Sequence, residues 1–217
     1  LYDGEPVLLL GGSDEDNLFN APDMMRRNLD ILDRVGGNYI RGTLSWRDEG
    51  NVPPYLADDD GMYDLERFNP EFFGRLDTCL REAAARDIVV QIEIWATFDY
   101  YRDNWLVNPY NPKNNVNYTV DDTRLTTEWP HHPASRPQPF FFSVPSRNND
   151  RVLLRYQEAF VRQLLDITLN YGNVLYCLDN ETKAPAEWAL HWGAFIHEEA
   201  AQRGKKVCLT EMWDQWD

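Results

Sequence analysis

Apolar runs and helix-forming stretches alternate along most of this chain, and the alternation limits the folds it can adopt. Runs of aliphatic residues with the length of buried strands occupy 6–10, 38–44, 88–94, 174–178 and 206–210. Helical patterns occupy 21–35, 70–86, 150–171 and 185–203. Because strands that alternate with helices form parallel sheets with right-handed crossovers, the sequence predicts one α/β domain spanning residues 1–217.

The first helical stretch also carries signals for its ends. Asn20 is a candidate N-cap, Pro22 lies in the first turn, and Gly36-Gly37 would stop the helix. The pair Asn69-Pro70 is a similar start for the next helix. These start and stop signals support the division of the chain into separate strand–helix units.

Residues 99–149 break the alternation. They are rich in Asn, Pro, Asp and aromatic residues and show no helical period. They follow the third expected strand, so they lie at its carboxyl end, where binding sites form in both barrels and open α/β sheets. We expect this long insertion to form a wall or lid of a binding cleft, and a surface excursion or a disordered loop is the alternative.

Polar residues occupy one face of two expected strands. Side chains alternate along a strand, so Arg41 shares a face with Tyr39 and Thr43, and Glu93 shares one with Gln91 and Trp95. Buried parallel strands are normally apolar throughout, so these polar faces are unusual. Arg41, Gln91 and Glu93 are therefore predicted to converge inside a barrel near its mouth. The alternative is an Arg41–Glu93 ion pair with a purely structural role.

Asn180 and Glu181 follow an apolar run that is predicted to be a buried strand. A carboxyl group at the end of a barrel strand can protonate a departing glycosidic oxygen, and a neighbouring amide can bind a sugar hydroxyl. The alternative is a solvated turn whose Glu caps the next helix. Other candidates for substrate contact are Asp14, after the first expected strand, and the tryptophans Trp46, Trp95 and Trp213, since aromatic rings pack on sugar rings.

The net charge of −15 argues against partners that are themselves anionic. Such a surface repels nucleic-acid phosphates and acidic lipids. No apolar run approaches the 18 or more residues of a membrane-spanning helix. The four His and three Cys show no metal-ligand spacing, so neither a metal nor another cofactor is expected. The chain begins with Leu1, so a signal peptide could have been removed, and a periplasmic or secreted location is expected.

These residues together resemble the first half of a clan A glycoside hydrolase. Residues 3–12, Asp-Gly-Glu-Pro-Val-Leu-Leu-Leu-Gly-Gly, are similar to the entry into the first strand of that barrel. Asn38-Tyr39-Ile40-Arg41 is similar to its second strand, and Asn180-Glu181 matches the Asn-Glu pair that ends its fourth. Gly12-Ser13-Asp14 and the stretch from Asp103 to Tyr118 also look like uncharacterised bacterial cellulase-like proteins. The resemblance implies a (β/α)8 TIM barrel of which this chain supplies about strands 1–5.

The resemblance also implies a retaining mechanism, in which Glu181 is the acid/base and Asn180 contacts the sugar 2-hydroxyl. Such barrels have about 250 residues, and the family's nucleophile ends strand seven, so it is expected outside this chain. Within the chain, only Glu93 or Glu211 could replace it. Two other functions stay open: a carbohydrate-binding barrel without catalysis, and an isomerase or lyase that uses Glu93, Glu181 and a divalent metal.

Overall fold

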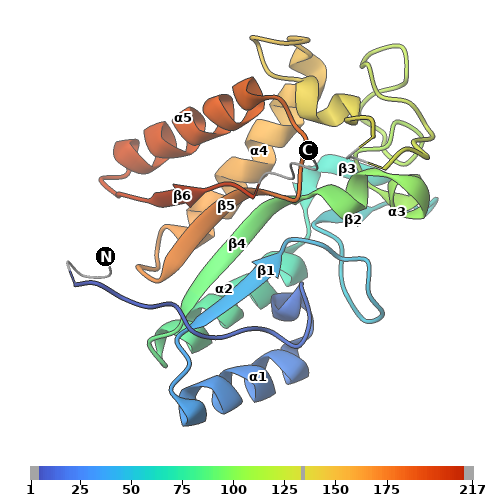
Figure 1. The fold of residues 1–217 in the computed structure, drawn as a ribbon. Coiled ribbons are helices and arrows are strands. Elements are labelled where there is room, and N and C mark those ends of the chain that lie inside the picture. The colour runs from blue at the N-terminus through green and yellow to red at the C-terminus, as the bar shows by residue number, and fades with distance from the viewer. Residues whose placement is uncertain (1–4, 133–134, 213–217) are drawn as a thin grey trace.

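The computed structural model describes residues 5–132 and 135–212, and its centre is a parallel sheet covered by helices (Figure 1). The sheet contains β1 (Tyr39–Thr43), β4 (Val89–Ala96), β5 (Val174–Asn180) and β6 (Cys208–Thr210), in that spatial order. Every neighbouring pair is parallel. All four strands therefore end on the same side, where residues 99–149 lie (Figure 1).

Helices connect the strands and follow the same order in space. They are α1 (Pro22–Val35), α2 (Pro70–Ala84), α4 (Arg151–Thr168) and α5 (Ala186–Gln202). Helix α2 contacts α1 and α4, and α4 contacts α5. This curved arrangement of parallel strands and outer helices is part of a (β/α) barrel, as the alternation in the sequence predicts.

The helix ends follow local sequence signals, with one exception. Pro22 lies in the first turn of α1, and Gly36 ends it with a left-handed φ of 76°, which glycine adopts without strain. The side chains of Asn69 and Asp150 accept hydrogen bonds from the first turns of α2 and α4. The predicted cap at Asn20 is wrong: Asn20 ends a short 3-10 helix, η1 (Leu18–Asn20), and its buried amide binds Val52 instead.

The first expected strand, residues 6–10, is not a strand in the structure. The segment still runs beside β1. Gly11 forms an isolated parallel bridge with Tyr39, and the backbone N–H of Asn38 donates to the Leu10 carbonyl. The backbones of Gly11 and Tyr39 are so close that a Cβ added at Gly11 would lie 1.9 Å from the Tyr39 carbonyl oxygen. Four parallel strands, rather than five, are therefore found among the described residues.

An antiparallel hairpin that the sequence did not suggest follows β1. It consists of β2 (Tyr55–Ala57) and β3 (Tyr63–Phe68). Its turn forms because the Asp58 carboxylate accepts from the backbone N–H groups of Asp60 and Met62, and Gly61 adopts a φ of 80°. The hairpin bridges to the insertion through Tyr63 and Asn115.

The insertion at residues 99–149 is mostly irregular but well packed. It contains the end of η2 (Thr97–Tyr100), helix α3 (Arg102–Val107) and η3 (Pro139–Phe142). Asparagine amides support the backbone between the helices: the Asn111 side chain donates to the carbonyls of Trp105 and Thr127, and Asn115 donates to those of Pro109 and Asn111. Its role as a cleft wall stays a prediction.

The main core lies between the sheet and the helices and is rich in aromatic rings. Trp95, at the end of β4, is 1% exposed. Its ring contacts Phe160 of α4, Trp188 and Trp192 of α5, and rings of the insertion. The Trp95 ring therefore packs against the helices and not beside Glu93 as the sequence predicts, and Trp95 lies beyond Glu93, the last β4 residue that pairs with β1.

No helix in the described part of the chain is long and apolar enough to cross a membrane.

Candidate active site at the carboxyl ends of the strands

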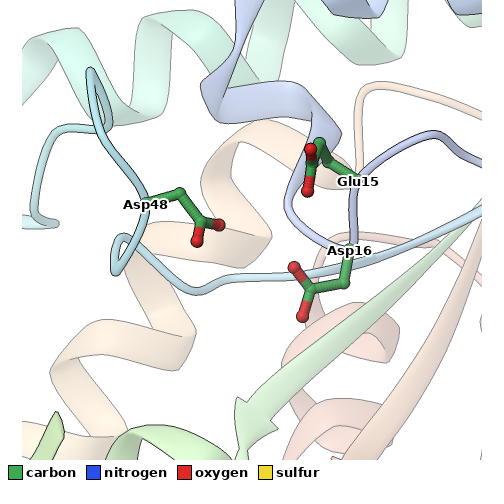
Figure 2. A group of neighbouring side chains, drawn as sticks. All are labelled: Glu15, Asp16 and Asp48. Carbon is green, nitrogen blue, oxygen red and sulfur yellow. The ribbon is translucent and has the colours of Figure 1, made fainter.

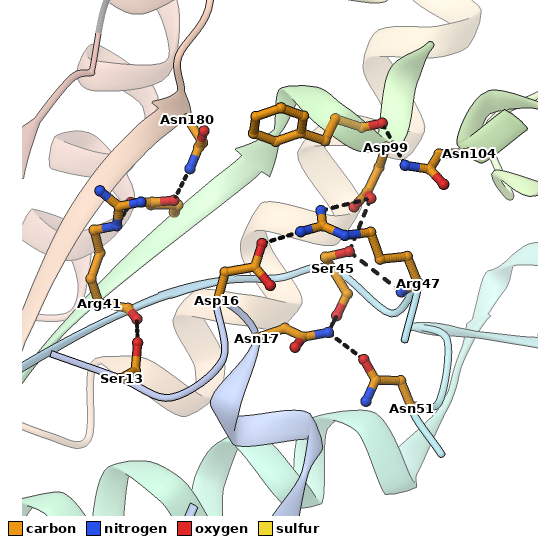
Figure 3. A network of polar contacts seen from close by, with 12 residues as sticks. Ser13, Asp16, Asn17, Arg41, Ser45, Arg47, Asn51, Asp99, Asn104 and Asn180 are labelled. Atoms are coloured by element: carbon orange, nitrogen blue, oxygen red, sulfur yellow. Dashed lines mark hydrogen bonds and ion pairs between the residues drawn. The ribbon is translucent and has the colours of Figure 1, made fainter. Parts of the chain in front are cut away.

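A buried carboxylate, Glu93 of β4, links three strands through its contacts with Arg41 and Asn180, which face each other in Figure 3. The Arg41 Nε of β1 lies 2.7 Å from Glu93 Oε1, and the Asn180 Nδ2 of β5 donates to Glu93 Oε2 at 2.5 Å. Gln91 donates to Oε1 at 3.4 Å, and accepts at 3.0 Å from the Tyr39 hydroxyl. The predicted convergence of Arg41, Gln91 and Glu93 is confirmed.

Burial and hydrogen bonding act against each other on Glu93. The side chain is fully buried, which raises its pKa because the charged form loses water. The hydrogen bond from Asn180, the charge of Arg41 and the hydrogen bond from Gln91 favour the carboxylate and limit the rise. Three donors thus stabilise the Glu93 carboxylate, and the bond to Glu93 in turn holds the Asn180 side chain in place.

Asn180 and Glu181 form a sharp turn at the end of β5. Asn180 is 3% exposed, and its Oδ1 has no hydrogen-bond partner in the described structure. Glu181 is exposed and adopts a left-handed φ of 48°, which is uncommon for a residue other than Gly, Asn or Asp. The turn is supported by a hydrogen bond of 3.3 Å from the Thr182 N–H to the Met212 carbonyl. An accessible carboxyl group and an unpaired amide oxygen are therefore adjacent.

A second polar group lies nearby, and the sequence did not point to it. Asp99 of η2 is 4% exposed, accepts from the Ser45 hydroxyl at 2.9 Å, and lies 3.8 Å from Arg47. Arg47 also pairs with Asp16 (Figure 3). Burial raises the pKa of Asp99 to about 7. The sequence did not predict this cluster of Asp99, Arg47 and Asp16, because each of these residues comes from a different segment of the chain.

Tyr101 connects the two parts of the site electrostatically. Burial raises the pKa of its phenol, the charges of Arg102 and Arg47 lower it, and the charge of Glu181 raises it. The Tyr101 hydroxyl therefore lies within electrostatic reach of both Glu181 and Arg47.

An open hollow of about 610 Å³ lies beside the Arg41 side chain. Its wall is the segment from Gly11 to Asp16, together with Tyr39, Arg41 and Arg47. Ser13 holds this wall against β1 by donating to the Arg41 carbonyl at 2.9 Å. Asp14 lies in the wall and is exposed, so the structure places this predicted contact at the hollow.

The predicted aromatic contacts differ in their accessibility. Trp46 is half-buried and follows β1, which keeps it a candidate. Trp95 is enclosed in the aromatic core and is left out of the site. Trp213 lies outside the described residues.

Three carboxylates near the hollow approach one another closely enough to be considered as metal ligands. Oxygen atoms of Glu15, Asp16 and Asp48 lie within 4.8 Å of one another (Figure 2). Glu15 and Asp48 are exposed and Asp16 is already paired with Arg47. Solvated acidic groups of this kind are common on acidic proteins, so the cluster by itself does not indicate a metal.

Comparison with known proteins gives no match to a family model and none to a curated protein. Solved structures do match. A glycoside hydrolase family 5 mannosidase from Rhizomucor miehei has a TM-score of 0.60 and 16% identity over 96% of this chain and 52% of its own. An endo-β-1,4-mannanase from Thermotoga petrophila gives 0.60 and 14% over 96% and 43%. Endo-glycoceramidase II from Rhodococcus sp. gives 0.53 and 17% over 96% and 49%.

The likeness covers nearly all of this chain but only about half or less of each of those proteins. Identities of 14 to 17% show a shared fold and leave the chemistry to be argued from the residues. The expected resemblance to clan A glycoside hydrolases is confirmed at this level: the chain has the fold of part of a family 5 (β/α) barrel.

Proposed function

We propose that this chain supplies the acid/base side of a retaining glycoside hydrolase site. Glu181 would protonate the glycosidic oxygen as the bond to the leaving sugar breaks, and would then take a proton from the water that releases the second sugar. Asn180 would accept a hydrogen bond from a sugar hydroxyl through its unpaired Oδ1. A carbohydrate is therefore the proposed substrate.

The observation that carries the proposal is the geometry of the Asn180–Glu181 turn. Glu181 is exposed in a left-handed conformation, and such conformations in residues other than glycine gather at functional sites. Its neighbour Asn180 is held by a buried carboxylate, which is itself held by Arg41. A solvated turn that only capped a helix would not need this support.

The nucleophile is proposed to lie outside residues 1–217. A retaining site needs a second carboxylate about 5 Å from the acid/base. Glu93 is fully buried and bonded to Arg41 and Asn180. Glu211 lies in hydrogen-bond contact with Asp179. Neither group is therefore free to attack a sugar.

Hydrolysis by the natural protein and by Glu181→Gln tests the acid/base role. Aryl glycosides with poor leaving groups need a proton, so their kcat/KM should fall by about 10²–10⁴. Substrates with dinitrophenyl leaving groups need little protonation and should lose much less in the glycosylation step. Glu187→Gln is the matched control, since Glu187 is a nearby surface residue paired with Arg147. Equal losses for both leaving groups would refute the assignment of Glu181.

A carbohydrate-binding barrel without catalysis is the second candidate, and the engagement of Glu93 and Glu211 favours it. Calorimetric titration with manno- and gluco-oligosaccharides separates the two. Binding with no product after prolonged incubation of the natural protein would support the binding function. The contacts of Glu93 with Arg41 and Asn180 argue against the metal-dependent isomerase or lyase, which would need Glu93 as a free ligand or base.

A further inference from the structure

Asp179, the residue before the Asn180–Glu181 turn, is fully buried at the end of β5. Both of its carboxyl oxygens accept from the Trp188 Nε1 of α5, at 3.2 and 3.0 Å. A single indole N–H cannot balance a full negative charge away from water. Asp179 therefore needs a further partner.

That partner is a second acid. The Glu211 side chain, which follows β6, is in hydrogen-bond contact with Asp179. The other titratable groups that act on this place are Cys177 of β5, Tyr100 of η2 and, through Cys177, Glu93 of β4. No cation is recorded among the groups that face Asp179 in the described structure.

Two carboxyl groups in hydrogen-bond contact without a cation do not both ionise when one of them is fully buried, because like charges in contact repel strongly where water is excluded. One proton between them removes the repulsion and forms a hydrogen bond from one acid to the other. Two such groups titrate as a pair rather than as two independent acids.

We propose that Asp179 and Glu211 share one proton and that this carboxyl pair positions the Asn180–Glu181 turn. Its contribution to Glu181 rests on the proposed function, whereas the pair itself does not. Asp179 and Glu211 are positioning residues: Asp179 is fully buried, Glu211 is half-buried and bonded to it, and both act on a sugar only through the turn that carries Glu181.

The pair can act on the turn because it joins two strand ends. Residues of β5 and β6 are paired only as far as Cys177 and Thr210, so the carboxyl pair extends the connection beyond the last ladder contact. The Thr182–Met212 hydrogen bond lies just past it. Loss of the shared proton would push the strand ends apart and release that hydrogen bond, and the direction of Glu181 would change.

The test is a pH titration of the natural protein by nuclear magnetic resonance. The side-chain carboxyl carbons of Asp179 and Glu211 should titrate together, and the Asn180 side-chain amide and the Glu181 backbone amide should shift with the same midpoint. In Asp179→Asn the amide can donate to Glu211 and still accept from Trp188, so the turn should keep its position and its signals should no longer move at that midpoint. Glu198→Gln, which changes an exposed acid on α5, should leave every titration unchanged.

Independent titration of the two acids near their ordinary pKa values would overturn the shared proton. A common midpoint without any response at Asn180 and Glu181 would overturn the positioning role and leave a purely structural pair. If Asp179→Asn does not fold, Glu211→Gln provides the same comparison, because its amide can donate to Asp179. None of these results requires activity on a sugar, so a failure of the proposed function would be seen separately.

Discussion

Two fully buried acids on neighbouring strands, Glu93 and Asp179, are stabilised in opposite ways. Glu93 has a cation and two amide donors, which favour its charged form. Asp179 has one indole donor, which favours its charged form, and a second acid, which together with burial outweighs that donor and favours a proton. Burial raises the pKa of both, but only around Glu93 do strong opposing contacts limit the rise. Equal burial therefore does not imply equal charge: the partners decide whether a buried acid is ionised.

Among these variants, Arg41→Met should lower the free energy of unfolding most. It removes the cation that pairs with Glu93 and leaves Glu93, like Asp179, without one. Breaking a buried ion pair from one side costs about 3–5 kcal/mol, and Arg41 is 42% exposed, so we expect a loss of about 2–3 kcal/mol in the free energy of unfolding. Urea denaturation at pH 7 measures it. Arg155→Met, which breaks an exposed pair with Glu66, should cost less than about 1 kcal/mol.

The double variant Arg41→Met/Glu93→Gln should recover most of the loss, since no buried charge then remains. A loss in Arg41→Met no greater than that in Arg155→Met would contradict the dependence of Glu93 on its cation.

Asp99 is an intermediate case, with a hydroxyl donor and an arginine at 3.8 Å. Its pKa of about 7 in the folded protein is raised from 3.8, so folding favours the protonated form. Stability from this group is complete below about pH 4 and is lost as the pH rises through about 7. Asp99→Asn has no such dependence, so relative to the natural protein it should gain about 1–3 kcal/mol between pH 5 and pH 8.

Urea denaturation at several pH values checks the Asp99 prediction. Asp59→Asn, at an exposed turn, should follow the natural protein at every pH. Parallel stability curves for Asp99→Asn and the natural protein would show that Asp99 is ionised throughout.

Replacement of Glu181 should change the stability of the protein least, because its side chain is exposed and only its backbone conformation is strained. Glycine adopts a φ of 48° freely, whereas alanine keeps a left-handed penalty of about 1–2 kcal/mol. After the greater entropy of unfolded glycine is subtracted, Glu181→Gly should be about 0.5–1 kcal/mol more stable than Glu181→Ala. Thermal denaturation of the two variants decides it, and equal stability would argue against a strained turn.

Sequence patterns predicted the parts of the fold that depend on local periodicity. The long helices and the parallel strands from β1 onward follow apolar spacing, and alternation along β4 correctly brought Glu93 toward Arg41. The same alternation failed at Trp95, which lies beyond the last β1 pair and packs its ring against Phe160 and Trp192 of the helices. The segment 6–10 has the composition of a strand but lacks the continuous ladder that defines one.

The candidate site was only half predictable for a related reason. Asn180 and Glu181 are adjacent in the sequence, so their chemistry could be recognised directly. Ser45 and Arg47 follow β1, whereas Asp99 lies more than fifty positions later in η2, and only the fold brings them together. Asp179 could have been noticed as a charge inside an apolar run, but its partner Glu211 lies 32 positions away, from 179 to 211.

The asparagine supports of the insertion have a consequence for the ageing of the protein. Amides do not ionise, so the bonds from Asn111 and Asn115 to backbone carbonyls are insensitive to pH and salt. Deamidation would replace each pair of N–H donors with carboxylate oxygens that only accept, facing carbonyl oxygens that also only accept. The contacts that are insensitive to pH and salt would therefore be lost through slow chemical change of a single side chain.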